Sequence, residues 1–199
     1  CEEAIENCDY SLIWEEHIHY FTVDSLERTL QRLGWRVVKI TRELVEEEAI
    51  LIAIAQPPRE ISRPLVEAAS VGRLCVSTNF GKKFEERRQR VLNFLRETQR
   101  TGSRLYILGA NHSASNFIDL FGEAGLFVGC LDDNPKKQGK YISSLNVPII
   151  SLEALPFEMS TFVVSAIHLG RTELAEKKLL DILGSRVVIR RVAEVIVHC

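Results

Sequence analysis

Hydrophobic residues follow two different patterns along the chain. The first third has a short apolar run at residues 10–14 and then a helical pattern, which starts at Thr22, a suitable N-cap, and stops at Gly34. Two stretches with a strand-like pattern follow at residues 35–42 and 48–56. These patterns predict a buried strand, an amphipathic helix and a β-hairpin.

From residue 79 onward the pattern is more regular, and a charged helix over residues 79–100 is expected first. After it, strands are predicted at residues 105–108, 126–131, 147–150, 161–166 and 186–189, and helices at residues 113–124, 152–155 and 172–183. Strands that alternate with helices form right-handed crossovers and a parallel sheet. We therefore predict an α/β protein with a Rossmann-like, doubly wound parallel sheet in a C-terminal domain, residues 79–199.

The stretch that joins the two patterns contains several residues that break secondary structure. It begins with Pro57 and Pro58, and Pro64 and Gly72 interrupt any long helix. A boundary here leaves residues 1–78 as a separate N-terminal unit with its linker.

Composition narrows the possible partners. Of the 199 residues, 46% are hydrophobic and 26% are charged, a balance typical of globular proteins. The longest apolar runs, at residues 49–55 and 161–167, are far shorter than the ~20 residues that cross a bilayer. The formal charge of -2 argues against a broad nucleic-acid surface. We expect neither a membrane nor a nucleic acid as a partner.

The five cysteines give no metal-binding pattern. They are scattered without a Cys-x-x-Cys pair or a matching histidine spacing, so we predict no metal site and a reduced, cytoplasmic protein. No basic and apolar leader opens the sequence. The chain starts at Cys1 and its only methionine is Met159, so we expect a fragment or a processed piece of a longer protein.

A candidate anion site lies between the first strand of the C-terminal domain and the next helix. Its residues are Gly109, Ala110, Asn111, His112 and Ser113. A strand, a glycine turn and a helix N-terminus in this order present backbone N–H groups to a phosphate. Asn111 stands where a dinucleotide-binding turn has its middle glycine, which argues against NAD or FAD. We therefore predict a substrate-binding turn for a single phosphate or another polar group.

Asp132 and Lys137 are predicted to join this site. Asp132 comes 23 residues after Gly109, at the end of the second strand, where a Rossmann-type acid contacts a ribose. Lys137 belongs to the basic loop at residues 136–140, which can contact phosphates at the same edge of the sheet. In the alternative interpretation these residues bind no ligand. Gly109 and Asp132 then only stabilise the turns in which they lie, and the lysines are exposed to solvent.

A second cluster, formed by Glu15, Glu16, His17 and His19, follows the apolar run at residues 10–14. A histidine accepts a proton near neutral pH, and an adjacent carboxylate can hold its tautomer and stabilise the imidazolium. The cluster therefore predicts a general base. Two alternatives stay open: a structural histidine, or a metal held by His17 and His19, for which no third ligand stands at a recognisable spacing.

Several motifs in order resemble a known family. Residues 9–22, with the sequence DYSLIWEEHIHYFT, resemble the E-H-x-x-Y-F-[ST] segment of S-adenosylmethionine-dependent C-methyltransferases that act on nucleotide-linked deoxysugars. In the second half, residues 107–110 are similar to the G-x-G-A opening of that family's C-terminal domain. Residues 131–139, LDDNPKKQG, are similar to its D-x-N-P-x-K-x-G loop. The resemblance covers most of the chain.

The resemblance implies an enzyme of three parts: an N-terminal zinc-binding segment, a class I methyltransferase core that binds S-adenosylmethionine, and a Rossmann-like C-terminal domain that helps to hold the nucleotide sugar. It implies that Glu16 and His17 lie at the sugar, with His17 as the base that removes a proton from a carbon next to a ketone. It makes Tyr20 a residue that lines the active site. The carbonyl delocalises the carbanion, which then attacks the methyl group of the sulfonium.

This chain would carry only part of such an enzyme. The sequence lacks the family's glycine-rich S-adenosylmethionine loop and zinc cysteines, so we expect no cofactor in this fragment and no activity from it alone. Residues up to about 56 would then be the last helix and strands of the class I fold. Their open sheet edge can support a homo-oligomer. The alternative function is a non-catalytic nucleotide or nucleotide-sugar binding module.

Overall fold

The computed structural model describes residues 5, 10, 13, 19–45, 48–58, 75–155, 160–167 and 169–198. Glu16 and His17, two of the three predicted catalytic residues, lie outside the described residues. Most of the predicted strand at residues 10–14 also lies outside them, with only Tyr10 and Ile13 described.

The N-terminal unit contains the predicted helix, α2 (Val23–Arg32). The Thr22 side chain accepts a hydrogen bond from the backbone N–H of Ser25 (3.2 Å), and the Ser25 hydroxyl accepts one from the backbone N–H of Thr22 (2.8 Å). This reciprocal pair satisfies two backbone donors that a helix start leaves unpaired. Gly34 follows the helix with a φ of +81°, which favours glycine. Local residues thus set both ends of α2, as predicted.

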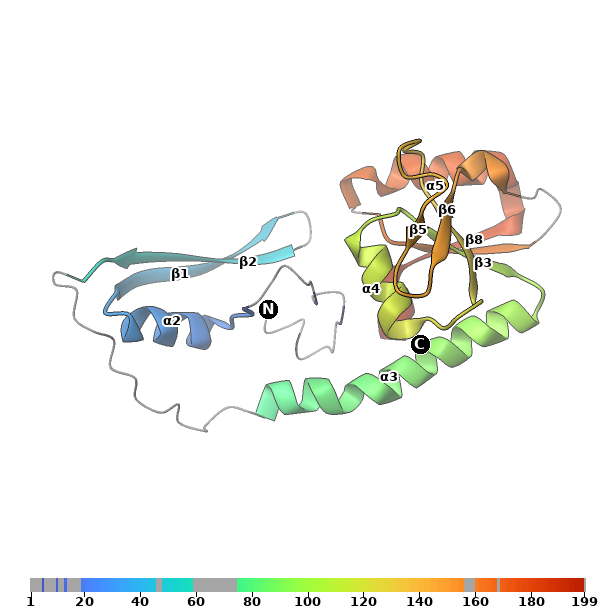
Figure 1. Ribbon diagram of the computed structural model, residues 1–199. Coiled ribbons are helices and arrows are strands. Elements are labelled where there is room, and N and C mark those ends of the chain that lie inside the picture. The colour runs from blue at the N-terminus through green and yellow to red at the C-terminus, as the bar shows by residue number, and fades with distance from the viewer. Residues whose placement is uncertain are drawn as a thin grey trace.

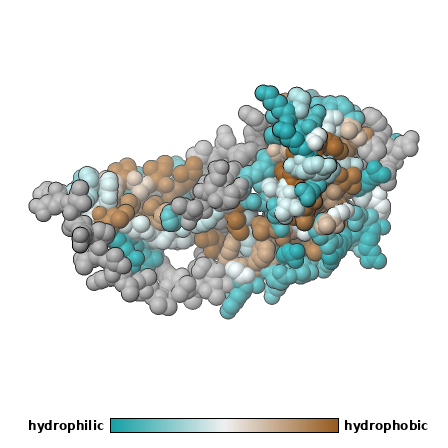
Figure 2. All heavy atoms as spheres, viewed as in Figure 1, coloured by the Kyte–Doolittle hydropathy of each residue, from teal (hydrophilic) through white to brown (hydrophobic). Residues whose placement is uncertain are grey.

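The predicted hairpin is also present. Strands β1 (Arg36–Val45) and β2 (Glu48–Gln56) pair antiparallel in a two-stranded sheet. Ile50, Ile52 and Ile54 alternate along β2 and are all exposed, Ile54 by 57%. Figure 2 shows hydrophobic residues gathered over this part of the molecule. A hairpin with one bare isoleucine face is an unusual solvent surface for a globular protein.

The C-terminal domain is built on a six-stranded sheet. Its strands are β3 (Arg104–Leu108), β4 (Phe127–Leu131), β5 (Tyr141–Ile142), β6 (Val147–Ile150), β7 (Thr161–Ser165) and β8 (Val187–Arg191). The spatial order is β5-β6-β4-β3-β7-β8, and every neighbouring pair is parallel except β5 with β6. The chain runs outward from β3 to β6, then returns to β7 on the other side of β3. This is the doubly wound, Rossmann-like order, and it confirms the predicted fold class.

Helices cover both faces of this sheet (Figure 1). Helices α3 (Cys75–Arg100), α4 (His112–Phe121) and α6 (Val192–His198) pack on one face, and α5 (Leu169–Leu183) and the short η2 (Leu152–Ala154) pack on the other. A second short turn, η3 (Gly184–Arg186), leads into β8. Side chains of β3 alternate between the two layers: Leu105 and Ile107 join the first, Tyr106 and Leu108 the second.

Some predicted boundaries were wrong. Helix α4 ends at Phe121 rather than at residue 124, and α3 starts earlier than residue 79. The loop after β4 contains β5, and α6 follows β8; neither was predicted. Tyr10 and Ile13 are not in a strand, because the Ile13 N–H donates to the Tyr10 carbonyl (3.2 Å) as in a turn.

Candidate functional site

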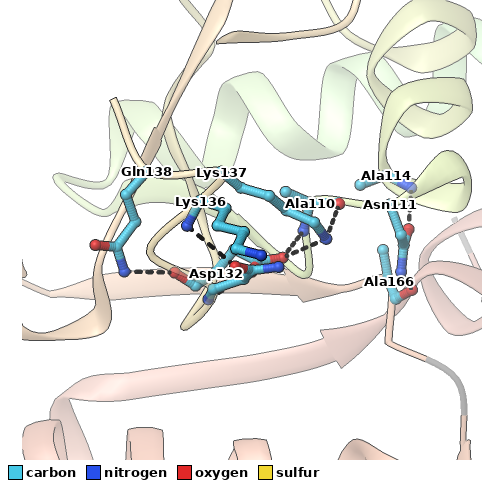
Figure 3. Close-up of polar contacts among 9 residues, drawn as sticks. Ala110, Asn111, Ala114, Asp132, Lys136, Lys137, Gln138 and Ala166 are labelled. Carbon is cyan, nitrogen blue, oxygen red and sulfur yellow. Dashed lines mark hydrogen bonds and ion pairs between the residues drawn. The ribbon is translucent and has the colours of Figure 1, made fainter. Parts of the chain in front are cut away.

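The predicted substrate residues come together at the carboxyl edge of the parallel sheet (Figure 3). Gly109 follows β3, Asp132 follows β4 and Ala166 follows β7. Between β3 and β7 the strand order reverses, and ligands of doubly wound sheets bind at such a switch point. This edge is therefore the candidate binding site.

Gly109 makes the turn at the switch point. Its φ is +93°, and its N–H donates to the Leu131 carbonyl (2.8 Å). A Cβ at this position would lie 2.8 Å from Cγ1 of Ile167, closer than such atoms approach. The glycine therefore serves two purposes, a backbone conformation that other residues rarely adopt and the close packing of Ile167 above it.

Asp132 closes the turn from the neighbouring strand. Its Oδ2 accepts hydrogen bonds from the Ala110 N–H (2.8 Å) and from the Lys137 ammonium (3.2 Å), and its Oδ1 accepts one from the Asn134 N–H (2.9 Å). The side chain is only 13% exposed. Lys137 also donates to the Ala110 carbonyl (2.7 Å). We predicted that this carboxylate contacts a ribose, but in the structure it accepts three hydrogen bonds from the protein itself.

Asn111 caps helix α4 and links the turn to β7. Its Oδ1 accepts from the Ala114 N–H (3.0 Å), and its Nδ2 donates to the Ala166 carbonyl (2.8 Å). Asparagine at this position thus caps the helix with its side chain, which the middle glycine of a dinucleotide-binding turn cannot do. Side-chain oxygens already occupy two N–H groups at the helix start, those of Ala110 and Ala114, so an anion must compete for them. Whether the turn binds a ligand stays a prediction.

His112 and Ser113 occupy the first turn of α4. The Nε2 atom of His112 lies 2.8 Å from Nδ2 of Asn116. Ser113 and Asn116 line a small hollow beside Tyr10 and Val192. Its volume of about 10 Å³ suits a single water molecule, not a nucleotide.

Sequence reasoning missed the contacts of Asn116 and Tyr10. Asn116 Nδ2 also donates a hydrogen bond to the carbonyl of Ile13. Tyr10 is 1% exposed, and its hydroxyl donates to the Phe80 carbonyl (2.8 Å). Its ring lies 4.9 Å from the ring of Phe84, between centroids. The apolar run at residues 10–14 was the one available signal, and it indicated burial but not the partner.

The predicted catalytic set is described only in part. Tyr20 lies just before α2 and its side chain is exposed. Glu16 and His17 lie outside the described residues. The roles of Glu16, His17 and Tyr20 therefore stay predictions.

Cys130, two residues before Asp132, is a core residue rather than a site residue. Burial raises the pKa of its thiol to about 12, and the charge of Asp132 adds to the rise while Lys137 opposes it. A thiol with such a pKa stays protonated at neutral pH, so it is a poor nucleophile and a poor metal ligand.

Two further properties concern only the described residues. Among those residues, His, Cys, Asp and Glu form no group of three that could hold a metal ion. No helix within them has both the length and the apolar character that crossing a membrane requires.

Comparison with protein families identifies the domain. Residues 66–174 match the family described as the C-methyltransferase C-terminal domain. The chain belongs to this family. The match covers more than half of the chain and includes Gly109, Asp132 and Lys137, whereas Glu16, His17 and Tyr20 lie before it. No curated protein is significantly similar to the chain in sequence. The chain therefore contains a C-methyltransferase C-terminal domain, which supports a role in methyl transfer.

S-adenosylmethionine, the usual methyl donor of methyltransferases, does not fit the turn of this C-methyltransferase domain. Rossmann-like turns that bind adenosine leave the backbone above the glycine open and offer an acid to the ribose hydroxyls. Here Ile167 packs over Gly109, and the Asp132 carboxylate already accepts three hydrogen bonds. No step that involves the methyl donor is therefore assigned to these residues.

Proposed function

We propose that this chain is the C-terminal part of a cytoplasmic, S-adenosylmethionine-dependent methyltransferase that methylates a carbon of a nucleotide-linked keto-sugar. The longer protein is called the parent enzyme below. The match of residues 66–174 to the C-methyltransferase C-terminal domain carries this proposal. Residues 1–78 are then the end of the class I core with its linker, and residues 79–199 the domain that helps to hold the substrate. The methyl donor binds elsewhere in the parent enzyme.

Lys137 supports a substrate that carries phosphate. An ammonium group has three N–H donors, of which the Ala110 carbonyl and the Asp132 carboxylate take two. The Lys137 side chain is 41% exposed, so the third donor can reach a phosphate oxygen from solvent. A nucleotide-linked sugar offers such oxygens in its diphosphate. Gly109, Asn111, His112 and Ser113 shape the turn and the helix start around this contact.

Calorimetry on the 199-residue chain tests this contact. A nucleoside diphosphate sugar is expected to bind weakly, and Lys137→Met should weaken binding about tenfold, the lower end for a lost charge-assisted hydrogen bond. Lys140→Met, in the same loop and exposed, is the matched control and should bind as the unchanged chain does. Equal losses in the two variants would mean that only general positive charge matters. S-adenosylmethionine is expected not to bind.

His17 is the proposed base and Glu16 its partner. A proton on a carbon next to a ketone is acidic because the carbonyl takes up the charge of the carbanion, so one well-placed base can remove it. Imidazole titrates near neutral pH, and the Glu16 carboxylate stabilises the imidazolium that forms. In this proposal Tyr20 lines the active site.

The proposed base is tested in the parent enzyme. His17→Ala is expected to abolish turnover while nucleotide-sugar binding by the second domain stays within about twofold, because the base acts only in the chemical step. His19→Ala, at the nearby histidine, is the control. Unchanged turnover in His17→Ala would reject the assigned role.

The alternative function, a non-catalytic nucleotide or nucleotide-sugar binding module, also has one observation in its favour. The family match contains the turn and Lys137 but none of the three predicted catalytic residues. A parent enzyme in which the Lys137 variant loses nucleotide-sugar binding but the His17 variant keeps full turnover would favour this alternative.

A further inference from the structure

A buried hydroxyl without a partner lies at the end of β7. Ser165 is the last residue of this strand and is 3% exposed. Within the part of the chain that the structure describes, no group forms a hydrogen bond with its Oγ atom. A serine hydroxyl can donate one hydrogen bond and accept two, and burying it without any of them costs folding free energy. Native proteins keep few such groups, so this one needs an explanation.

Ser165 lies next to the switch point of the sheet. It pairs in register with Leu108 of β3 on one side and with Arg191 of β8 on the other. Strand residues alternate between the two faces of a sheet, and Val163, two residues earlier, lies in the layer that α5 covers. The hydroxyl of Ser165 therefore faces the α5 layer, at the edge where doubly wound sheets bind their ligands.

Arg191 brings a positive charge to the same place. Its pairing with Ser165 puts the two Cα atoms about 4.8 Å apart, the spacing of neighbouring strands. Ile189, two residues earlier, packs in the α5 layer, so Arg191 is on the same face as Ser165. Arg191 is half-buried, and its backbone N–H donates to Glu194 (3.2 Å), but no described residue pairs with its guanidinium. A hydroxyl and a cation without described partners are thus neighbours.

The start of α5 adds to this arrangement. The helix begins at Leu169, four residues after Ser165, and covers this face of the sheet (Figure 1). Because the chain leaves β7 at the carboxyl edge, the N-terminus of α5 lies at that edge too. A helix N-terminus carries a partial positive charge that favours an anion. A hydroxyl, a guanidinium and a helix N-terminus together suit a phosphate group.

We propose that Ser165 and Arg191 form a phosphate-binding subsite at the ends of β7 and β8, separate from Lys137. The guanidinium can hold two phosphate oxygens, and the hydroxyl donates to one of them. The end of β4, which leads to Asp132, is two strand spacings from Ser165, about 10 Å, so an extended ligand can contact both places. The subsite itself does not require the proposed function: it holds a phosphate of the nucleotide sugar if that function is correct, and free phosphate if it is not.

Binding at this subsite needs a small movement at the strand end. The Ser165 hydroxyl is covered by protein, whereas Arg191 is only half-buried. Ile167, two residues after Ser165, packs in the same layer and is also half-buried. Displacement of this side chain opens the hydroxyl to an anion that Arg191 attracts.

Urea denaturation of the 199-residue chain, in phosphate and in chloride of equal ionic strength, is the first test. In chloride, Ser165→Ala should raise the urea midpoint, because it removes the unpaired hydroxyl. In the unchanged chain, phosphate should raise the midpoint further, since a bound ligand stabilises the folded state. Ser165→Ala and Arg191→Gln should each weaken phosphate binding about tenfold and so lose most of this second increase.

Arg190→Gln is the matched control. Arg190 is exposed and pairs with Val164, which lies in the opposite layer, so this variant makes the same change of charge on the other face. It should keep the full effect of phosphate. An equal loss in Arg190→Gln, no effect of phosphate on the unchanged chain, or a lower midpoint of Ser165→Ala in chloride would each overturn the subsite.

Uridine diphosphate glucose then identifies the source of the phosphate. If the nucleotide sugar occupies the subsite, Arg191→Gln should weaken its binding about tenfold in calorimetry, and the double variant with Lys137→Met should bind more weakly than either single variant. Unchanged binding in Arg191→Gln, together with the lost phosphate effect, supports a subsite for free phosphate. If the unchanged chain does not bind the nucleotide sugar, the substrate contact under the proposed function is rejected, whereas the phosphate measurement still decides the subsite.

Discussion

Gly109→Ala tests how tightly the switch point is closed. At φ +93° an alanine is strained, which costs about 1–2 kcal/mol for residues in the left-handed region. The new Cβ would also lie 2.8 Å from Cγ1 of Ile167, and overpacking of this kind costs about 1–3 kcal/mol. The expected loss of unfolding free energy is therefore about 2–5 kcal/mol. Chemical denaturation followed by far-UV circular dichroism measures it.

Two companion variants separate the strain from the clash. Gly125 has a similar φ of +78°, but a Cβ there would meet no atom within 4 Å, so Gly125→Ala should lose only the ~1–2 kcal/mol of strain. Ile167→Ala removes the atom that the added methyl group would meet, so Gly109→Ala should cost ~1–3 kcal/mol less in that background. Equal losses for the two glycine variants, or strict additivity with Ile167→Ala, would refute the close packing.

Three other properties follow from the structure. Cys130 should resist thiol reagents at pH 8 in the folded chain and react after unfolding, as peptide mapping can show, because its pKa is about 12. The hydrogen bond from Arg96 lowers the pKa of Glu123, so this pair stabilises the fold above the unfolded pKa of Glu123 and stops doing so as the pH falls through the folded value. Arg96→Met should therefore flatten the acid limb of a stability–pH curve slightly, since the pair is largely exposed. Ile52→Lys should reduce any self-association of the 199-residue chain in analytical ultracentrifugation, because it places a charge on the bare face of the hairpin.

The elements that could be predicted are those whose signals are local. Thr22 and Ser25 cap α2 within a single turn, so neighbouring residues are enough to determine where this helix starts. Alternation of strands and helices was enough to predict the parallel sheet. Because the carboxyl ends of parallel strands lie at one edge of the sheet, Gly109 and Asp132, which follow neighbouring strands, lie at the same edge. The short β5 and α6 carry too few residues for a periodic pattern to emerge, and they depend on the sheet beside them.

The contacts that could not be predicted join distant parts of the chain. Asn116 and Ile13 are 103 residues apart, and nothing in either neighbourhood indicates the other. Tyr10 belongs to a run that reads as a strand, but burial of its ring against α3 and α4 outweighs that local preference. Tertiary packing decided both cases.

The role of Asp132 shows the limit of motif reasoning most clearly. An acid at the end of the second strand is equally suited to accept from a ribose hydroxyl or from the protein's own donors, and the residue type does not distinguish them. In the structure the Asp132 carboxylate accepts from Lys137, which lies five residues later in a loop, and from two backbone N–H groups, whereas the ribose contact stays a prediction.

A closed turn changes how this domain can hold a substrate. Because Asp132 and Asn111 already occupy the N–H groups of Ala110 and Ala114, a phosphate must compete for these donors or use an outer contact such as the third donor of Lys137. One such contact gives weak binding, so tight binding requires a second surface. The N-terminal part of the chain also contacts this domain, since the Ile13 carbonyl accepts a hydrogen bond from Asn116 of α4. Substrate affinity should therefore depend on both parts of the chain, whereas the turn alone should bind a nucleoside diphosphate only weakly.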